Sequence, residues 1–210
     1  KFHMKSFGTT QAQLAAVAAK NHAHSAHNPL SQYREAMTVD EVMAARKVSW
    51  PLTLPMCSPI SDGAAAAILC REEELDRFDR SRAVKIHATA LRTGSDRDPQ
   101  EFDRHITHLA ARDAYARAGL GPEDMHVAEV HDATAFAEIQ QVENLGFCDF
   151  GEGGALTESG ATSIGGRIPV NLSGGLESKG HPVGATGLAQ VFELTTQLRG
   201  EAGARQVANA

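Results

Sequence analysis

The most informative part of the chain reads Asn171-Leu-Ser-Gly-Gly-Leu-Glu-Ser-Lys-Gly-His-Pro-Val-Gly-Ala-Thr-Gly187, with five glycines and one histidine, His181. Residues 167–171 lead into it and are typical of a short strand, while residues 188–198 follow it and predict a helix. Glycines let a ligand approach the backbone, and free amides at a helix N-terminus favour negative charge. His181 is therefore a candidate acid or base, although glycine loops are also common as simple turns. The glycine spacing does not fit G-x-G-x-x-G, and no G-K-[ST] follows, which excludes the usual nucleotide-binding loops.

A second stretch places another histidine at the end of a predicted strand. The sequence Met125-His-Val-Ala-Glu-Val-His-Asp-Ala-Thr-Ala-Phe-Ala-Glu-Ile139 predicts a strand followed by a helix, with His131 and Asp132 between them. In α/β sheets, polar residues at the carboxyl ends of strands point into the ligand crevice. Because such turns commonly converge at one edge of the sheet, we expect His131 and His181 to lie together in one crevice.

The rest of the chain alternates between predicted strands and helices. Residues 64–69 form an uninterrupted apolar run, as expected for a strand buried on both faces, and residues 83–91 alternate in the manner of a strand. This order favours an α/β fold with helices on both sides of a sheet. Helices are predicted at 9–22, 38–46 and 103–119, with Thr10 and Thr38 as N-caps of the first two.

Composition limits the class of protein and its location. Hydrophobic residues make up 42% of the 210 residues and charged residues 22%, which is ordinary for a globular protein. A formal net charge of -6 does not favour general nucleic-acid binding, and no apolar run is long enough to span a bilayer. The three cysteines form no C-x-x-C pair, which indicates a reducing compartment, so we expect a cytoplasmic protein without a membrane partner.

Both histidine stretches resemble motifs of the thiolase superfamily, and most closely those of its sterol carrier protein X-type branch, which includes acetyl-CoA acetyltransferase-like proteins. Residues 171–187 resemble the glycine–histidine–proline loop of that branch. Residues 131–134 resemble its His-Asp-Cys-Phe or His-Asp-Ala-Phe motif, with Thr134 in place of the aromatic residue, and residues 61–66 resemble a strand that closes the N-terminal half of the fold. The resemblance implies an α/β, thiolase-like fold made of the C-terminal α-β-α half with a remnant of the N-terminal half and loop domain.

The resemblance also suggests how the chain is divided. Residues 1–82 would be the loop-domain remnant and the last strand of the N-terminal half, and residues 83–210 would be a truncated C-terminal thiolase domain. Neither of the family's two cysteine motifs is present, so we expect the chain to be incomplete and, by itself, weakly active or inactive. Cys57 is discounted as a nucleophile, because the family's nucleophilic cysteine lies further upstream, and is expected to pack near the site.

The resemblance implies a role for each candidate site residue. His181 would deprotonate the nucleophilic cysteine and help to hold it as a thiolate. His131, in place of the family's usual Asn–water pair, would polarise the thioester oxygen of an acyl-CoA. Asp132 would lie at the substrate site and orient the turn or cap the following helix. The other candidate substrate-binding residues are Ser173, Gly174, Gly175 and Gly180, of which the first three would allow close approach of pantetheine or of a dimer neighbour.

The implied function is a thiolase-type acyl-CoA acyltransferase, a transferase of lipid metabolism that acts in fatty acid or sterol degradation by thiolytic cleavage or Claisen condensation. It would be a homo-oligomer and would need no cofactor beyond its coenzyme A thioester substrate. Two alternatives stay open. One is a thiolase-fold aldolase that cleaves a β-hydroxyacyl-CoA of sterol side chains with a small OB-fold (DUF35-type) partner, and the other is a non-catalytic thiolase-like subunit.

Metal chemistry is the remaining rival. The side chains of His131, Asp132 and His181 are of the right types for a metal hydrolase, but no H-E-x-x-H or similar spacing supports one. A histidine-rich segment also occurs at His22, His24 and His27, without the cysteines or carboxylates that a structural zinc site usually includes. We therefore expect no metal site.

Overall fold

The helix α2 (Gln11–Ser25) is the element against which most of the others pack in a computed structural model that describes residues 1–94, 96–208 and 210. It begins at Thr10, whose hydroxyl accepts the backbone N–H of Gln13 at 3.1 Å, while the Gln13 side chain accepts the Thr10 N–H in return. This capping satisfies donors that have no partner within the helix. The predicted helix and its cap are confirmed, and its buried apolar face includes Leu14, Val17 and Ala18.

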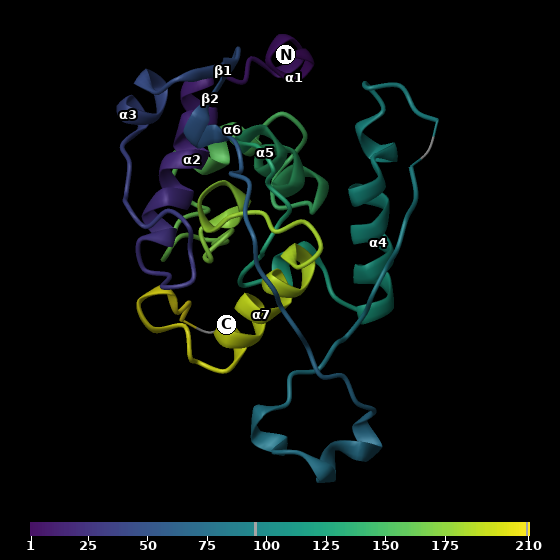
Figure 1. Ribbon diagram of the computed structural model, residues 1–210. Helices are drawn as coiled ribbons and strands as arrows, with labels where there is room; N and C mark the ends of the chain where they lie inside the picture. Colours follow the sequence, from purple (N-terminus) through teal and green to yellow (C-terminus); the bar gives the residue numbers. More distant parts are fainter. Residues whose placement is uncertain (95, 209) are drawn as a thin grey trace.

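Figure 1 shows α5 and α6 beside α2, with α3 and a small hairpin at its N-terminal end, while α4 lies apart from it. The helices are α1 (Phe2–Phe7), α3 (Val39–Ala44), α4 (Ile106–Ala118), α5 (Ala135–Asn144), α6 (Gly153–Glu158) and α7 (Thr186–Leu198). The hairpin consists of β1 (Lys47–Ser49) and β2 (Leu52–Thr53), which pair antiparallel. Short turns of helix are η1 (Leu54–Met56), η2 (Glu72–Arg77), η3 (Arg80–Arg82), η4 (Phe102–Arg104), η5 (Pro122–Asp124), the π-turn η6 (Gly175–Lys179) and η7 (Gly203–Arg205).

Two clusters of buried apolar side chains form the core. The first joins α2 to α3 and α5, and the second lies under the two segments that carry the histidine motifs. Burial removes apolar surface from water, and each Val, Leu, Ile, Phe or Met side chain in these clusters contributes about 1.5–3 kcal/mol. The first cluster contains Leu14, Ala15, Val17, Ala18, Val42, Met56, Ala135 and Ile139, and the second contains Val130, Val142, Phe147, Ile168 and Val170.

The two histidine-bearing segments run parallel to each other. Ala128 donates its N–H to the Pro169 carbonyl at 3.0 Å, and its own carbonyl accepts the Asn171 N–H at 2.8 Å. Asn171 has a left-handed backbone with φ 56°, and its side-chain oxygen accepts the Val130 N–H at 2.8 Å. The Asn171 side chain therefore continues the pairing where the backbone turns away.

Several predicted strands are not formed, which corrects the expectation of a regular sheet within this chain. The predicted strands at 125–130 and 167–171 are reduced to the single bridge between Ala128 and Val170, and residues 64–69 and 83–91 are extended but unpaired. A strand needs a neighbour to satisfy its backbone groups, and no described residue supplies one to these two segments. Their apolar side chains stay exposed, with Leu69 at 74% and Leu91 at 90% of full exposure.

The extended segments lead out to and back from a protruding loop that carries η2 and η3 at the bottom of Figure 1. This loop holds the proposed boundary after residue 82. The first core cluster, however, combines Leu14 and Met56 from before that boundary with Ile139 from after it. The division at residue 82 therefore stays a prediction.

The other predicted helices are present. Thr38 and Glu41 form the expected capping box of α3, and α4 ends at Gly119, whose φ of 69° suits a glycine. α6 was not predicted, because its six residues begin with two glycines. In the part of the chain that the structure describes, no helix has the length and apolar character needed to cross a membrane.

Candidate active site

The glycine-rich loop is held tightly against the body of the protein. Gly174, Gly175 and Gly180 have φ values of 101°, 61° and 115°, which side chains rarely adopt. A Cβ atom at Gly174 would collide with Ser25 of α2, and one at Gly175 would collide with the Asp132 carboxylate. The space in which a side chain at Gly174 or Gly175 would lie is therefore filled by the chain itself, and the approach of pantetheine or of a dimer neighbour at these glycines stays a prediction.

His181 is held by one hydrogen bond at its backbone N–H and one at a ring nitrogen. Its backbone N–H donates to the Ser61 hydroxyl at 3.1 Å, and its Nδ1 lies 2.7 Å from Oγ1 of Thr186. When the Thr186 hydroxyl donates its one hydrogen to the Pro182 carbonyl at 3.2 Å, its oxygen accepts the proton on Nδ1. We assign this arrangement, in which Nε2 of His181 has a free lone pair.

The charge state of His181 suits a base. Burial, followed by the nearby His131 and Lys179, lowers the pKa of His181 below the ordinary histidine value. The ring is therefore neutral at neutral pH and becomes protonated only as the pH falls below the usual histidine range. A neutral ring with an unprotonated Nε2 can accept a proton from a thiol or from the carbon next to a thioester.

His131 and His181 come together at one place. The ring centroids are 4.9 Å apart and the ring planes meet at 86°, an edge-to-face arrangement. The His131 side chain is exposed and the His181 side chain is half-buried. We call these two side chains the imidazole pair. The two rings lie close together because the parallel pairing described above aligns the ends of residues 125–130 and 167–171.

Asp132 lies beneath the imidazole pair and does not face a ligand. Its carboxylate is fully buried, with Oδ1 accepting the Leu176 N–H at 2.8 Å and Oδ2 accepting the Asn21 amide at 3.1 Å. Burial, and then the neighbouring Glu138, raises the pKa of Asp132 well above its usual range. Helix α5 has no side-chain cap, so the expected capping by Asp132 is wrong, and its expected contact with substrate is not supported by this burial. Its hydrogen bonds orient the glycine loop instead.

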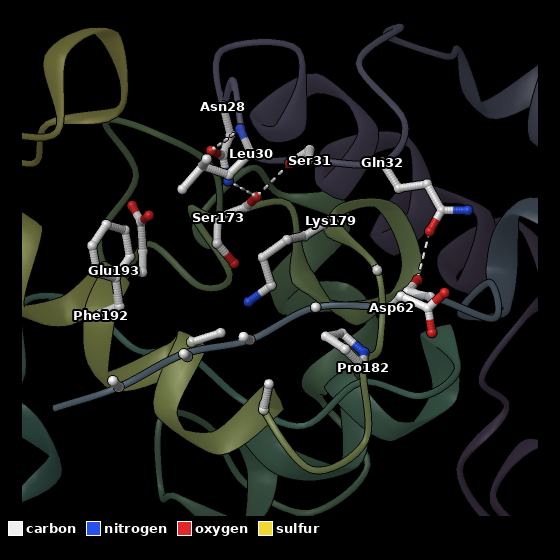
Figure 2. A pocket seen from close by; sticks show the side chains of 18 residues that line it. Asn28, Leu30, Ser31, Gln32, Asp62, Ser173, Lys179, Pro182, Phe192 and Glu193 are labelled. Atoms are coloured by element: carbon white, nitrogen blue, oxygen red, sulfur yellow. Dashed lines mark hydrogen bonds between the residues drawn. The ribbon is translucent and has the colours of Figure 1, made fainter.

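A cavity of about 630 Å³ opens beside the imidazole pair, and Figure 2 shows its lining. His181 lies between two lining residues, Gly180 and Pro182, and is held by a third, Ser61. The imidazole rings themselves are not part of the wall. The cavity is of the size that small-molecule sites usually have. Its other lining residues are Asn28, Leu30, Ser31, Gln32, Asp62, Gly63, Ala64, Ala65, Ala66, Ser173, Lys179, Ala185, Ala189, Phe192 and Glu193.

Ser173 and Gly180 are the two predicted substrate-binding residues that line this cavity. The Ser173 hydroxyl donates to the buried Glu129 carboxylate at 2.6 Å, and the Ser173 N–H donates to the same carboxylate at 2.9 Å. Burial raises the pKa of Glu129, while Lys179 and the Ser173 bonds lower it. Because its hydroxyl is already engaged, Ser173 shapes the wall rather than presenting a free donor. A Cβ at Gly180 would approach the Ser61 hydroxyl to 2.6 Å, so this position also requires glycine.

Cys57 and Cys148 are not activated thiols in this chain. Cys57 pairs with Thr134 in an isolated antiparallel bridge, which places it near the His131 segment as expected. Burial and then Glu177 raise the pKa of the Cys57 thiol, and burial and then Glu143 raise the pKa of Cys148 to about 12. A nucleophilic cysteine normally has a lowered pKa, so neither thiol is prepared for attack.

The histidines near the end of α2 have structural roles. His24 Nδ1 donates to the Asn171 carbonyl at 3.1 Å, and its Nε2 accepts the Ile164 N–H at 3.2 Å. Burial, followed by Lys20, lowers the pKa of His24 to about 3, so the ring is neutral. His22 stacks on Tyr33 with ring centroids 5.9 Å apart. Among the described residues, no group of three or more His, Cys, Asp or Glu side chains is arranged to hold a metal ion.

Four residues that hold the site were not identified from the sequence. Thr186 lies five positions after His181 in the same motif, and this spacing could have indicated a contact across the first turn of α7. Asn21, Glu138 and Glu177 form a buried polar cluster with Asp132. Asn21 lies outside both histidine stretches, and the positions of Glu138 and Glu177 within them do not indicate a shared contact, so only the folded structure brings the three together.

Removal of the Thr186 hydroxyl should allow the His181 ring to populate both of its neutral tautomers. In Thr186→Val the Nδ1 proton loses an acceptor worth about 1 kcal/mol, so both tautomers become populated and the pKa of His181 falls further. Nitrogen-15 NMR of the imidazole ring measures both changes. Thr196→Val is the matched control, because Thr196 donates to the Phe192 carbonyl at 2.8 Å on the same helix without touching a histidine. An unchanged His181 spectrum in Thr186→Val would contradict the assigned network.

Comparison with known proteins agrees with this architecture. Residues 89–210, more than half of the chain, match the family described as Thiolase C-terminal domain-like. The chain is 48% identical over 210 residues to an acetyl-CoA acetyltransferase of Methanothermobacter thermautotrophicus, covering 99% of this chain and 55% of that protein. It is 44% identical over 220 residues to sterol carrier protein 2 of Rattus norvegicus, covering 100% of this chain and 40% of that protein.

A solved structure, that of an Ltp2-ChsH2(DUF35) aldolase, resembles this fold with a TM-score of 0.77 and 24% sequence identity, covering 99% of this chain and 56% of the other. The chain belongs to the thiolase C-terminal domain-like family and has an α/β, thiolase-like fold. It spans about half the length of the curated relatives it matches.

Proposed function

We propose that the protein is a thiolase-type acyl-CoA acyltransferase, which cleaves a 3-ketoacyl-CoA with coenzyme A or condenses two acyl-CoA thioesters in reverse. The proposal depends on one observation above all. The rings of His131 and His181 lie 4.9 Å apart beside a cavity, and His181 is held as a neutral base by Thr186. Family membership and the acetyltransferase relative support the same chemistry.

In this proposal, the imidazole pair divides the work of carbonyl chemistry. His181 takes the proton of a cysteine thiol that lies outside this chain, and the thiolate attacks the 3-keto carbon. Cleavage of the carbon–carbon bond releases acetyl-CoA and leaves an acyl-cysteine, which the thiol of coenzyme A then converts to a shortened acyl-CoA. His131, exposed at the edge of the site, donates to the thioester oxygen and stabilises the negative charge that develops there.

The assay is thiolysis of acetoacetyl-CoA by this chain and by the complete product of its gene. We expect the 210-residue chain to show no turnover above the uncatalysed rate, because burial raises the pKa of the Cys57 and Cys148 thiols and neither of the family's two cysteine motifs is present. The complete product should turn over and should carry an acyl-cysteine that mass spectrometry detects when coenzyme A is omitted. A complete product that binds acetoacetyl-CoA but neither cleaves it nor becomes acylated would refute the proposal, and robust turnover by the chain alone would refute its incompleteness.

The aldolase is the second candidate, and the fold shared with a solved thiolase-like aldolase is what favours it. It would break the bond between the α and β carbons of a β-hydroxyacyl-CoA without a covalent thioester. The solved aldolase with a similar fold is named as a complex with a DUF35 protein, so a small OB-fold partner belongs to this candidate. Release of a ketone or aldehyde from a β-hydroxyacyl-CoA, without acylation of the protein, would favour it over acyl transfer. A homo-oligomer and a place in fatty acid or sterol degradation accompany either activity as part of the proposal.

A further inference from the structure

A single amide inside the protein holds the cluster of acids beneath the imidazole pair. Nδ2 of Asn21, on α2, lies 3.1 Å from Oδ2 of Asp132, 3.0 Å from Oε2 of Glu138 and 3.2 Å from Oε2 of Glu177. All four side chains have no exposed surface. We call them the Asn21 network. Such a concentration of acids is unusual, because a buried charge is costly unless it is paired.

The network connects the two segments that carry the imidazole pair. Asp132 follows His131 directly, and Oδ1 of Asp132 also accepts the Leu176 N–H at 2.8 Å. Glu177 lies in the π-turn η6, four residues before His181. Asn21 therefore joins the end of one histidine segment to the start of the other, and both positions depend on α2.

The donors in this network are too few for three ionised carboxylates. The Asn21 amide has two hydrogens for three acceptors, and the other donors are the Leu176 N–H, which serves Asp132, and the side chains of Lys20 and Asn171. Lys20 lies 2.8 Å from Oε1 of Glu138, and the Asn171 amide donates to Oε2 of Glu138 at 2.7 Å, so both serve the same carboxylate. Among the described residues of this network, Oε1 of Glu177, Oε1 of Glu138 and Oδ1 of Asn21 form no hydrogen bond, and of these only Oε1 of Glu138 has a cation beside it, the Lys20 ammonium at 2.8 Å.

The geometry distinguishes the three acids from one another. Both oxygens of Asp132 accept N–H groups, and Glu138 is paired with Lys20, so these two are the carboxylates that the protein solvates. Glu177 has one oxygen without a donor and no cation within salt-bridge distance among the described residues. Burial, followed by Asp132 and Glu138, raises the pKa of Glu177 well above its usual range, with Asn21 and Lys20 opposing the shift.

We propose that Asn21 and a neutral, proton-bearing Glu177 are positioning residues for the imidazole pair. Asn21 holds the two histidine segments in register, and the proton on Glu177 removes the repulsion that would otherwise drive η6 away from Asp132. The kinetic consequence rests on the proposed function, whereas the protonation and the ring geometry do not.

The proton on Glu177 has a direct spectroscopic test. The infrared spectrum of the chain at neutral pH should contain the carbonyl band of a protonated, buried carboxyl group, and Glu177→Gln should lack that band. Glu143→Gln is the matched control, because Glu143 is equally buried but is paired with His3 at 3.1 Å and lies outside the network. A band that persists in Glu177→Gln, or that is absent from the wild-type chain, would overturn the assignment.

The pH dependence of stability gives a second measurement on the same variant. Because the pKa of Glu177 is raised in the folded state, the folded chain binds more protons than the unfolded chain above the usual carboxyl range. The urea midpoint should therefore fall as the pH rises from that range through the raised pKa. Glu177→Gln should reduce this slope and leave only the contribution of Asp132 and Glu129, whereas Glu143→Gln should not. An unchanged slope in Glu177→Gln would contradict the proposal.

The positioning role is tested with Asn21→Ala. Its His131 and His181 ring signals should shift in nitrogen-15 NMR, and in the complete gene product kcat should fall about 10²-fold with KM little changed, as expected for misplaced catalytic groups. Glu177→Gln should keep kcat within about twofold, since it preserves a neutral side chain of the same shape. If Asn21→Ala does not fold, Glu177→Lys, which places a charge where the proposal needs neutrality, must shift the same ring signals. If the His131 and His181 ring signals of folded Asn21→Ala or folded Glu177→Lys stay at the wild-type positions, the positioning role is refuted. An inactive wild-type gene product would refute only the proposed function.

Discussion

Replacement of His181 by alanine in the complete gene product should lower kcat for thiolysis by about 10²–10⁴-fold, the usual contribution of a general base. The physical reason is that Nε2 of His181 is the free, unprotonated nitrogen of the imidazole pair, with its partner nitrogen held by Thr186. Activity of the wild type should fall with decreasing pH only below the usual histidine range, because burial, His131 and Lys179 lower the pKa of His181. Steady-state kinetics across pH measures both effects.

Control variants separate the effect of losing His181 from the effect of losing His131 and from that of losing a surface histidine. His87→Ala should leave kcat unchanged, because His87 is exposed in an extended segment away from the imidazole pair. His131→Asn should lose less activity than His131→Ala, since asparagine retains an N–H donor for the thioester oxygen. Equal kcat values for His181→Ala and the wild type would exclude the assigned role of His181.

Gly175→Ala should destabilise the chain by about 2–5 kcal/mol. Part of this free energy is the cost of a side chain in the left-handed region, about 1–2 kcal/mol at the φ of 61° found here. The rest comes from overpacking, because the added Cβ would overlap the Asp132 carboxylate, which is itself fixed by Leu176 and Asn21. Such a change is a large fraction of the total stability of a domain, and urea denaturation followed by circular dichroism measures it.

Two other glycines divide this effect into its parts. Gly203 has nearly the same φ, 59°, but a Cβ there would meet nothing within 4 Å, so Gly203→Ala should show only the backbone term. Gly184 has neither a positive φ nor a close neighbour, so Gly184→Ala should be close to neutral. If Gly175→Ala costs no more than Gly203→Ala, the contact with Asp132 does not constrain the loop.

The sequence predicted the helices better than the strands, for a physical reason. The caps Thr10 and Thr38 and the apolar face of α2 are local features, and the structure contains them. A strand depends on a partner that lies elsewhere, so the apolar run at 64–69 indicated an extended segment without revealing whether anything pairs with it. The short helix α6 was hidden because its first two residues are glycines.

The candidate site shows the same division between local and distant information. We could predict that His131 and His181 lie together, because both follow predicted strands whose ends share one edge, and the structure places their rings together. The fully buried position of Asp132 did not follow from its motif, since it depends on Asn21 and Leu176, which are 111 and 44 residues away in the sequence. Contacts at such separations carry no periodic signal.

The contacts between α2 and the glycine loop also bear on how the chain acquires its structure during synthesis. Lys20 donates to the Val170 carbonyl at 2.8 Å, and Ser25 meets Ser178 at 2.5 Å, across 150 and 153 residues. Closing loops of that length has an entropic cost that must be met before the contacts form, which slows folding. During synthesis, α2 leaves the ribosome before the segment that contains Val170 and Ser178 has been made. In that interval, the face of α2 that this segment later covers is open to chaperones and to premature association.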